Sequence, residues 1–141
     1  MSVARRICAL ALGACLLAAT PAAAANPYTP KEVCGSNYVK VGGPREIRGG
    51  GRLLAEAYLM YYNGFNCVAT IKRAYVGTQT YTEAWLWRGN YGNLAESQGN
   101  AAYYRTVTRY ADDTCVAFGG YSSGPGNTPR GSTTSGFGWC D

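Results

Sequence analysis

The sequence predicts an all-β fold, a small single-domain antiparallel sandwich or barrel held together by two disulfides. Three observations lead to this prediction. Short segments rich in β-branched and aromatic residues recur roughly every ten residues. An Asn-Gly pair separates two of these segments, and four cysteines remain once a predicted export signal is removed. The second half of the chain carries no helix signal, which favours a sandwich or barrel over a mixed fold.

The first 25 residues have the layout of a secretory signal peptide. A basic pair, Arg5-Arg6, precedes an apolar stretch over Ile7–Ala19, and small alanines close the segment. This order is typical of an export signal, and the apolar stretch is shorter than the ~20 residues that span a bilayer. We expect cleavage after Ala25. Residues 26–141 then form one domain that is secreted, with no membrane span.

Four cysteines remain after cleavage, namely Cys34, Cys67, Cys115 and Cys140. An even number of cysteines in a small exported chain predicts two disulfides. Three pairings are possible, and the sequence favours Cys34–Cys67 with Cys115–Cys140 because each pair closes a local loop. In the chain-entropy view each would contribute about 3–4 kcal/mol. The chain has no histidine and no Cys-x-x-Cys pair, so we expect no zinc site, no other metal and no cofactor.

The first part of the exported chain predicts one strand. Residues 26–31 contain two prolines and are expected to be an extended lead-in without helix. Residues 34–41 predict a short first strand that ends at Gly42-Gly43-Pro44. The glycines at 49–51 predict a flexible break.

Arg52–Tyr62 is the ambiguous segment. Its Leu, Ala and Glu residues favour a helix, whereas the continuation favours a strand. Asn63-Gly64 is a strong signal for a type I′ hairpin, in which both central residues have positive φ. The following residues, 65–75, alternate apolar and polar side chains as a half-buried strand does. We therefore expect a strand and keep a helix as the alternative.

The hairpin fixes a register. A two-residue loop pairs Tyr62 with Phe65, Met60 with Cys67 and Tyr58 with Ala69, which places Met60, Tyr58, Cys67 and Ala69 on one face of the sheet. Glu56 opposite Ile71 fits this face poorly, which predicts a break in register there. Met60 and Phe65 are expected to pack, and Tyr61, on the opposite face, is the hairpin residue expected to contact a partner.

The remaining segments complete the predicted β domain. Residues 80–87 predict a strand on which either Ala84 and Leu86 or Trp85 and Trp87 face inward, because alternation alone does not choose. The other expectations are a loop over 88–100, a strand over 101–110, a short strand over 114–118, and a Gly/Ser-rich loop near 119–138 that Cys140 tethers.

Residue chemistry excludes several classes of function. Without histidine, neither a Ser-His-Asp triad nor a Cys-His pair can form. Once Arg5 and Arg6 leave with the signal, 11 basic and 8 acidic residues remain, and they are scattered, so we expect no nucleic-acid partner. The mild positive balance suits an anionic envelope polymer. The residues carry no signal for an oligomeric state.

Catalysis by a pair of carboxylates is the one hydrolytic chemistry left open. Asp112-Asp113 is more simply a turn, and Glu83 and Glu96 lie in different segments that the pattern does not bring together. The other candidate acids are Glu32, Glu46 and Glu56. A carboxylate-dependent hydrolase is therefore the less favoured alternative, and the sequence assigns no catalytic residue.

Aromatic side chains give the positive functional signal. Several of them are neighbours on predicted strands, so that one ring of each pair must lie off the core. Exposed rings can stack on sugars, which makes Tyr61, Trp85 and Trp87 candidate contact residues for a cell-wall glycan. Strands also favour aromatics for purely structural reasons, so a carbohydrate-binding module is the alternative function.

Four stretches of the exported chain carry a family resemblance, together with Cys140 near the C-terminus. They are NPYTPKEVCGSNY at 26–38, YLMYYNGFNCVATIK at 58–72, GNAAYYR at 99–105 and TCVAFGG at 114–120. In these stretches the chain resembles the spore-associated protein A family of streptomycetes and related actinobacteria. The resemblance implies a small secreted protein found with the spore surface, without a known catalytic role. It transfers no active-site residue. The leading prediction is thus a secreted, non-enzymatic spore- or cell-envelope-associated protein whose partner is a spore-coat or cell-wall polymer.

Overall fold

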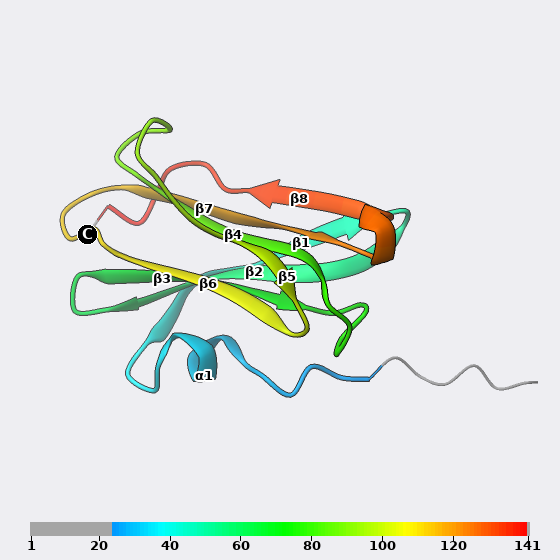
Figure 1. Cartoon of the computed structure of the whole chain (residues 1–141). Coiled ribbons are helices and arrows are strands. Elements are labelled where there is room, and N and C mark those ends of the chain that lie inside the picture. The colour runs from blue at the N-terminus through cyan, green and yellow to red at the C-terminus, as the bar shows by residue number, and fades with distance from the viewer. Residues whose placement is uncertain (1–23, 141) are drawn as a thin grey trace, which may run out of the picture.

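Two four-stranded antiparallel sheets face each other in this computed structural model, which describes residues 24–140, and a short helix covers the outside of one sheet (Figure 1). The all-β prediction is confirmed, as are both disulfides. The elements are α1 (Pro30–Cys34), β1 (Val39–Gly49), β2 (Arg52–Tyr62), β3 (Phe65–Lys72), β4 (Thr80–Arg88), β5 (Leu94–Ala101), β6 (Tyr104–Tyr110), β7 (Val116–Ser123), the 3₁₀ turn η1 (Pro125–Asn127) and β8 (Arg130–Thr134).

The strand order defines the two layers. The first sheet has the order β1-β2-β3-β6, and the second sheet has the order β5-β4-β7-β8. In Figure 1, α1 lies on the outer side of the first sheet and the second sheet lies on its other side. Between residues 24 and 140, no helix has the length and apolarity to cross a bilayer. Apart from Ala24 and Ala25, which are exposed, the predicted signal peptide lies outside the described residues.

The main core fills the space between the sheets. Its largest buried side chains are Ile47, Leu54, Leu59, Val68, Leu86, Val116 and Phe118. A second cluster lies on the other face of the first sheet, where Met60, Cys67 and Ile71 are covered by α1 and its flanking residues. As a result β3 is buried on both faces from Asn66 to Lys72.

The hairpin prediction is confirmed. Arg52–Tyr62 is a strand, Asn63 and Gly64 both have positive φ, and the three expected pairs form. The predicted break in register is wrong, because Glu56 pairs directly with Ile71. The Glu56 carboxylate is accommodated there because it accepts hydrogen bonds from Arg73 at 2.6 Å and from the Tyr58 hydroxyl at 2.8 Å.

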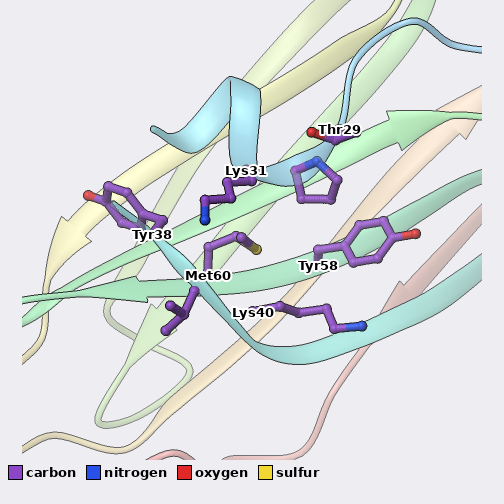
Figure 2. A pocket seen from close by; sticks show the side chains of 8 residues that line it. Thr29, Lys31, Tyr38, Lys40, Tyr58 and Met60 are labelled. Carbon is purple, nitrogen blue, oxygen red and sulfur yellow. The ribbon is translucent and has the colours of Figure 1, made fainter. Parts of the chain in front are cut away.

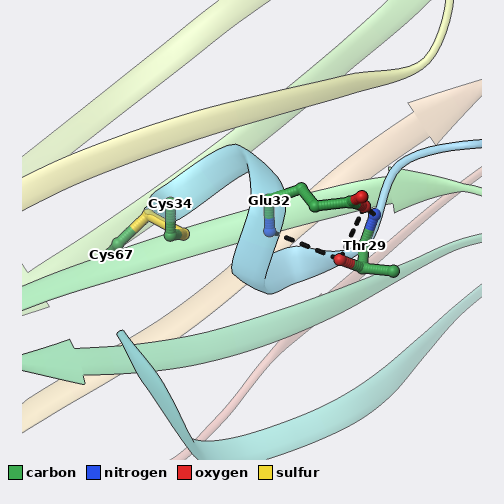
Figure 3. Close-up of a disulfide and its surroundings, with 4 residues drawn as sticks. All are labelled: Thr29, Glu32, Cys34 and Cys67. Carbon is green, nitrogen blue, oxygen red and sulfur yellow. Dashed lines mark hydrogen bonds between the residues drawn. A yellow bond between two sulfur atoms is a disulfide. The ribbon is translucent and has the colours of Figure 1, made fainter. Parts of the chain in front are cut away.

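The predictions for the N-terminal part of the domain need correction. Residues 30–34 form α1, whereas the sequence predicted a lead-in without helix and a strand from 34 to 41. Pro30 is compatible with a helix because it occupies the first turn, where its missing N–H has no partner to lose. Thr29 and Glu32 form a capping box, in which the side chain of each accepts a hydrogen bond from the backbone N–H of the other. The disulfide between Cys34 and Cys67 joins the helix to β3 (Figure 3). The first strand begins at Val39 and continues, with bulges, through Gly42-Gly43-Pro44.

Two predicted loops are strands. Leu94–Ala101 pairs with β4 over its whole length, so most of the predicted 88–100 loop is β5. The predicted 119–138 loop contains the end of β7 and all of β8. Its glycines allow close backbone contact, since a Cβ at Gly131 would overlap the carbonyl oxygen of Arg48 on β1. The glycine-rich composition therefore reflects tight packing of backbones rather than a loose loop.

Candidate functional site

The strand β4 presents its tryptophans outward. Ala84 and Leu86 are fully buried in the core, while Trp85 and Trp87 lie half-buried on the outer face of the second sheet. The sequence left both orientations open. In the structure the indole rings of Trp85 and Trp87 face outward. This outer face is the side turned away from the first sheet and from α1 (Figure 1).

Four rings continue one another along this face, and we refer to Trp85, Trp87, Tyr91 and Phe137 as the aromatic strip. Trp85 and Trp87 meet edge to face with ring centroids 5.8 Å apart. Trp87 contacts Tyr91 at 5.5 Å, and Tyr91 contacts Phe137 at 4.7 Å. Tyr91, in the β4–β5 loop, is 60% exposed and Phe137 is 36% exposed. Sequence reasoning found the two tryptophans and missed the other two rings, which come from the turn and from the C-terminal segment.

A glycine makes room for the first ring of the strip. Gly119 on β7 pairs with Trp85, and a Cβ at Gly119 would lie 2.5 Å from the Trp85 Nε1. The indole therefore lies over β7 instead of standing away from the sheet. Its Nε1 is buried and makes no hydrogen bond within residues 24–140.

Polar side chains border the strip on the same face. Register places Glu96 opposite Trp85, and Gln98 opposite Glu83. The Tyr81 hydroxyl donates a hydrogen bond to Gln98, whose amide donates to Glu96 at 3.2 Å. The carboxylate of Glu83, a second acceptor near that hydroxyl, raises the pKa of Tyr81, and the charge of Glu96 adds to the effect. The face thus combines exposed rings with carboxylate and amide groups that can accept or donate hydrogen bonds.

The structure brings Glu83 and Glu96 closer than the sequence pattern indicated. They lie on adjacent strands one diagonal step apart on the outer face, because β5 replaces the expected loop. Neither carboxylate lines the concave surface beside α1 that is described below, and neither lines the small pockets around Arg88 and around Trp139. Of the other acids, Glu46 pairs with Arg48 and Glu56 pairs with Arg73. Residues 24–140 contain no cluster of three or more potential metal-ligating His, Cys, Asp or Glu side chains.

Tyr61 lies on the face of the first sheet opposite Met60, as expected, but this face is turned toward the second sheet and not toward solvent. It lies half-buried on the first sheet and lines a small pocket together with Asn66 and Trp139. Phe65, which was expected to pack, is 42% exposed and touches the Tyr110 ring edge to face at 5.2 Å. The pattern of the hairpin predicted its register well, but it did not show which face a helix would cover.

A groove, which is the second candidate binding surface, lies where α1 crosses the first sheet (Figure 2). This groove has a volume of about 380 Å³. Its lining residues are Thr29, Pro30, Lys31, Tyr38, Val39, Lys40, Tyr58 and Met60. Sequence reasoning missed the groove because it missed α1, although the Thr-x-x-Glu capping box at 29–32 is the signal that would have revealed the helix.

A fully buried lysine lies at the end of β3. The Lys72 ammonium donates hydrogen bonds to the carbonyl oxygens of Thr78 at 2.6 Å and Ala101 at 3.0 Å. Burial lowers the pKa of Lys72 to about 8. Its backbone carbonyl in turn accepts a hydrogen bond from the Asn26 side-chain amide at 3.0 Å, which holds the segment before α1 against the domain.

Comparison with protein families, characterised proteins and solved structures gives no match to this chain. The aromatic strip and the groove beside α1 are therefore the two surfaces from which a function can be inferred.

Proposed function

We propose that this protein is exported, has no enzymatic activity, and attaches to the spore or cell envelope by binding a cell-wall glycan through the aromatic strip. The observation that carries the proposal is the continuous edge-to-face series of Trp85, Trp87, Tyr91 and Phe137 on the outer face of the second sheet. We therefore favour glycan binding by aromatic rings over hydrolysis by a pair of carboxylates.

The chemistry of the strip suits a sugar polymer. Exposed aromatic rings remain apolar surface in water, and such a patch is stabilised when an apolar partner covers it. A pyranose ring offers C–H groups on its faces and hydroxyl groups at its edge, so it can stack on an indole while its hydroxyls reach neighbouring polar groups. Glu83, Glu96 and Gln98 supply those groups beside Trp85.

Three further features support export and envelope attachment. The N-terminal segment has the layout of a signal peptide, and two disulfides are typical of chains that fold outside the reducing cytosol. The resemblance to the spore-associated protein A family points to the same location. Fractionation of sporulating cultures tests this part directly, and recovery of the protein only from the cytoplasm would contradict it.

Glycan binding is tested by co-sedimentation of the purified protein with insoluble peptidoglycan and with chitin. Tyr91→Ala is the sharpest variant because the ring is 60% exposed, and its removal disturbs little of the core. Tyr110→Ala is the matched control, since this tyrosine is 51% exposed on the first sheet, away from the strip. We expect retention of the parent protein and of Tyr110→Ala, and reduced retention of Tyr91→Ala. Equal retention of both variants, or no retention of the parent on either polymer, would refute the proposal.

A further inference from the structure

We propose that the groove between α1 and the first sheet binds a free single-chain amphiphile with a carboxylate headgroup, of the size of a medium-chain fatty acid. The groove lies beside α1, and Figure 1 shows α1 and the second sheet on opposite sides of the first sheet. The aromatic strip lies on the outer face of the second sheet, and the proposal does not depend on glycan binding. It rests on three features of the groove: an apolar floor, two lysines without acidic partners, and walls that are fixed before any ligand arrives.

The floor of the groove is apolar. Met60 and the ring of Tyr58 form it from β2, with Tyr38 and Pro30 at the sides. Met60 is 3% exposed and Tyr58 is 9% exposed, so both are core side chains with one surface open to the groove. Val39, on the edge strand β1, is 56% exposed at the rim. This combination lines the groove with apolar surface against which an alkyl chain can pack.

Lysines come from both walls. Lys31 descends from α1 toward Met60, and Lys40 runs from β1 beneath Tyr58 (Figure 2). Within residues 24–140 neither lysine makes an ion pair with a carboxylate. Glu32, which follows Lys31 in the sequence, accepts hydrogen bonds from Thr29, and Glu56 on β2 accepts one from Arg73. Two unpaired ammonium groups beside an apolar floor are complementary to an anionic headgroup on an apolar chain.

The walls are held in place by independent restraints. The Cys34–Cys67 disulfide fixes the end of α1 to β3, and the capping box fixes its start. Before the helix, Tyr28 packs edge to face against Tyr103 at 5.4 Å and Tyr104 at 5.1 Å. A ligand therefore finds a formed site and does not have to order one, which lowers the cost of binding.

The size of the groove limits the ligand. Its volume of about 380 Å³ lies near the lower end of the range of roughly 300–1,000 Å³ that holds small ligands. A chain of decanoate length fits this volume, whereas a two-chain lipid or a folded peptide segment exceeds it.

The test uses decanoate as the probe, measured by isothermal titration calorimetry against the purified protein. Decanol, with the same chain and no charge, is the ligand control. We expect decanoate to bind about tenfold more tightly than decanol, and the double variant Lys31→Gln/Lys40→Gln to lose that tenfold preference. Binding of decanol should be unchanged in the double variant. The methyl resonance of Met60 should shift on addition of decanoate, which places the ligand in the groove.

Arg130→Gln is the matched protein control, because it removes one positive charge from an exposed site on β8 of the second sheet. We expect it to keep the preference for decanoate. The proposal is overturned if decanoate and decanol bind equally, or if Arg130→Gln lowers the preference as much as the double variant does. Binding to anionic phospholipid vesicles without binding of free decanoate would also overturn it. Retention on peptidoglycan should be the same in the double variant and the parent, which separates this result from the test of glycan binding.

Discussion

Lys72 gives the most quantitative prediction, because a fully buried lysine couples stability to pH. Its ammonium lies among backbone carbonyls, and its pKa in the folded protein is about 8. In the unfolded chain a lysine titrates near 10.4. Between these two values the unfolded state binds more protons than the folded state, so the free energy of unfolding rises with pH. Below pH 8 both states carry the charge, and the cost of burying it is fully present.

The size of the effect follows from the two pKa values. Their difference corresponds to a total of about 3 kcal/mol, and about 2 kcal/mol of this should appear between pH 7 and pH 9.5. The deprotonated amine still has two N–H groups, one for each carbonyl that it now contacts. Neutralisation therefore removes the desolvated charge without leaving Thr78 or Ala101 without a donor.

Urea unfolding at several pH values from 7 to 9.5, followed by tryptophan fluorescence, measures the effect. Lys72→Met is the comparison, because it fills a similar volume and cannot titrate. We expect the free energy of unfolding to rise with pH by about 2 kcal/mol more in the parent than in Lys72→Met. The α-amino group titrates in both proteins and cancels in the difference. Equal pH dependence in the two proteins, or a fall in the parent's stability relative to the variant, would refute the reasoning.

Two other predictions concern what holds the layers together. The double variant Cys34→Ser/Cys67→Ser should lower the free energy of unfolding by about 3–4 kcal/mol, because the lost disulfide closes a segment with a sequence separation of 33 residues. Urea unfolding without reductant measures this loss, and an unchanged unfolding midpoint would contradict it. Gly131→Ala should lower the thermal midpoint strongly, because its Cβ would overlap the Arg48 carbonyl. Gly136→Ala, whose Cβ would meet nothing within 4 Å, should leave the midpoint nearly unchanged, and equal midpoints for the two variants would argue against close packing of β1 on β8.

The parts of the fold that the sequence predicted well depend on local signals. Asn63-Gly64 determines a two-residue turn, and a turn of known length sets the register of both strands. The disulfide pairing was favoured on loop length alone, and the structure agrees. These features need no information about distant segments.

The parts that were missed depend on long-range contacts. The residues of β5 are polar and glycine-containing, and they form a strand because β4 pairs with them along its length. β8 is a strand because its glycine lets the backbone of β1 approach closely. From composition alone, a glycine-rich segment is predicted to be a flexible loop. α1 has five residues and depends on Cys67 for its position, so its capping box was the only local sign of it.

The candidate site was half predicted for the same reason. The tryptophans of β4 were visible as a strand pattern, but the choice between their two faces required the second sheet. Tyr91 and Phe137 come from segments far apart in the chain, and only folding brings their ring centroids to 4.7 Å from each other. Tyr61 was expected to contact a partner because the sequence did not show that both faces of the first sheet are covered, one by the second sheet and the other by α1.

The most direct test of the central claim is an NMR titration with soluble peptidoglycan and chitin oligomers that observes the three tryptophan indole N–H signals. Trp139 is the internal control, because its Nε1 donates to the Val41 carbonyl at 2.8 Å and it lies outside the aromatic strip. The account predicts that the Trp85 and Trp87 signals shift with saturation while the Trp139 signal stays in place. Shifts of Trp139 alone, or no shift of any indole signal at millimolar oligomer, would contradict it.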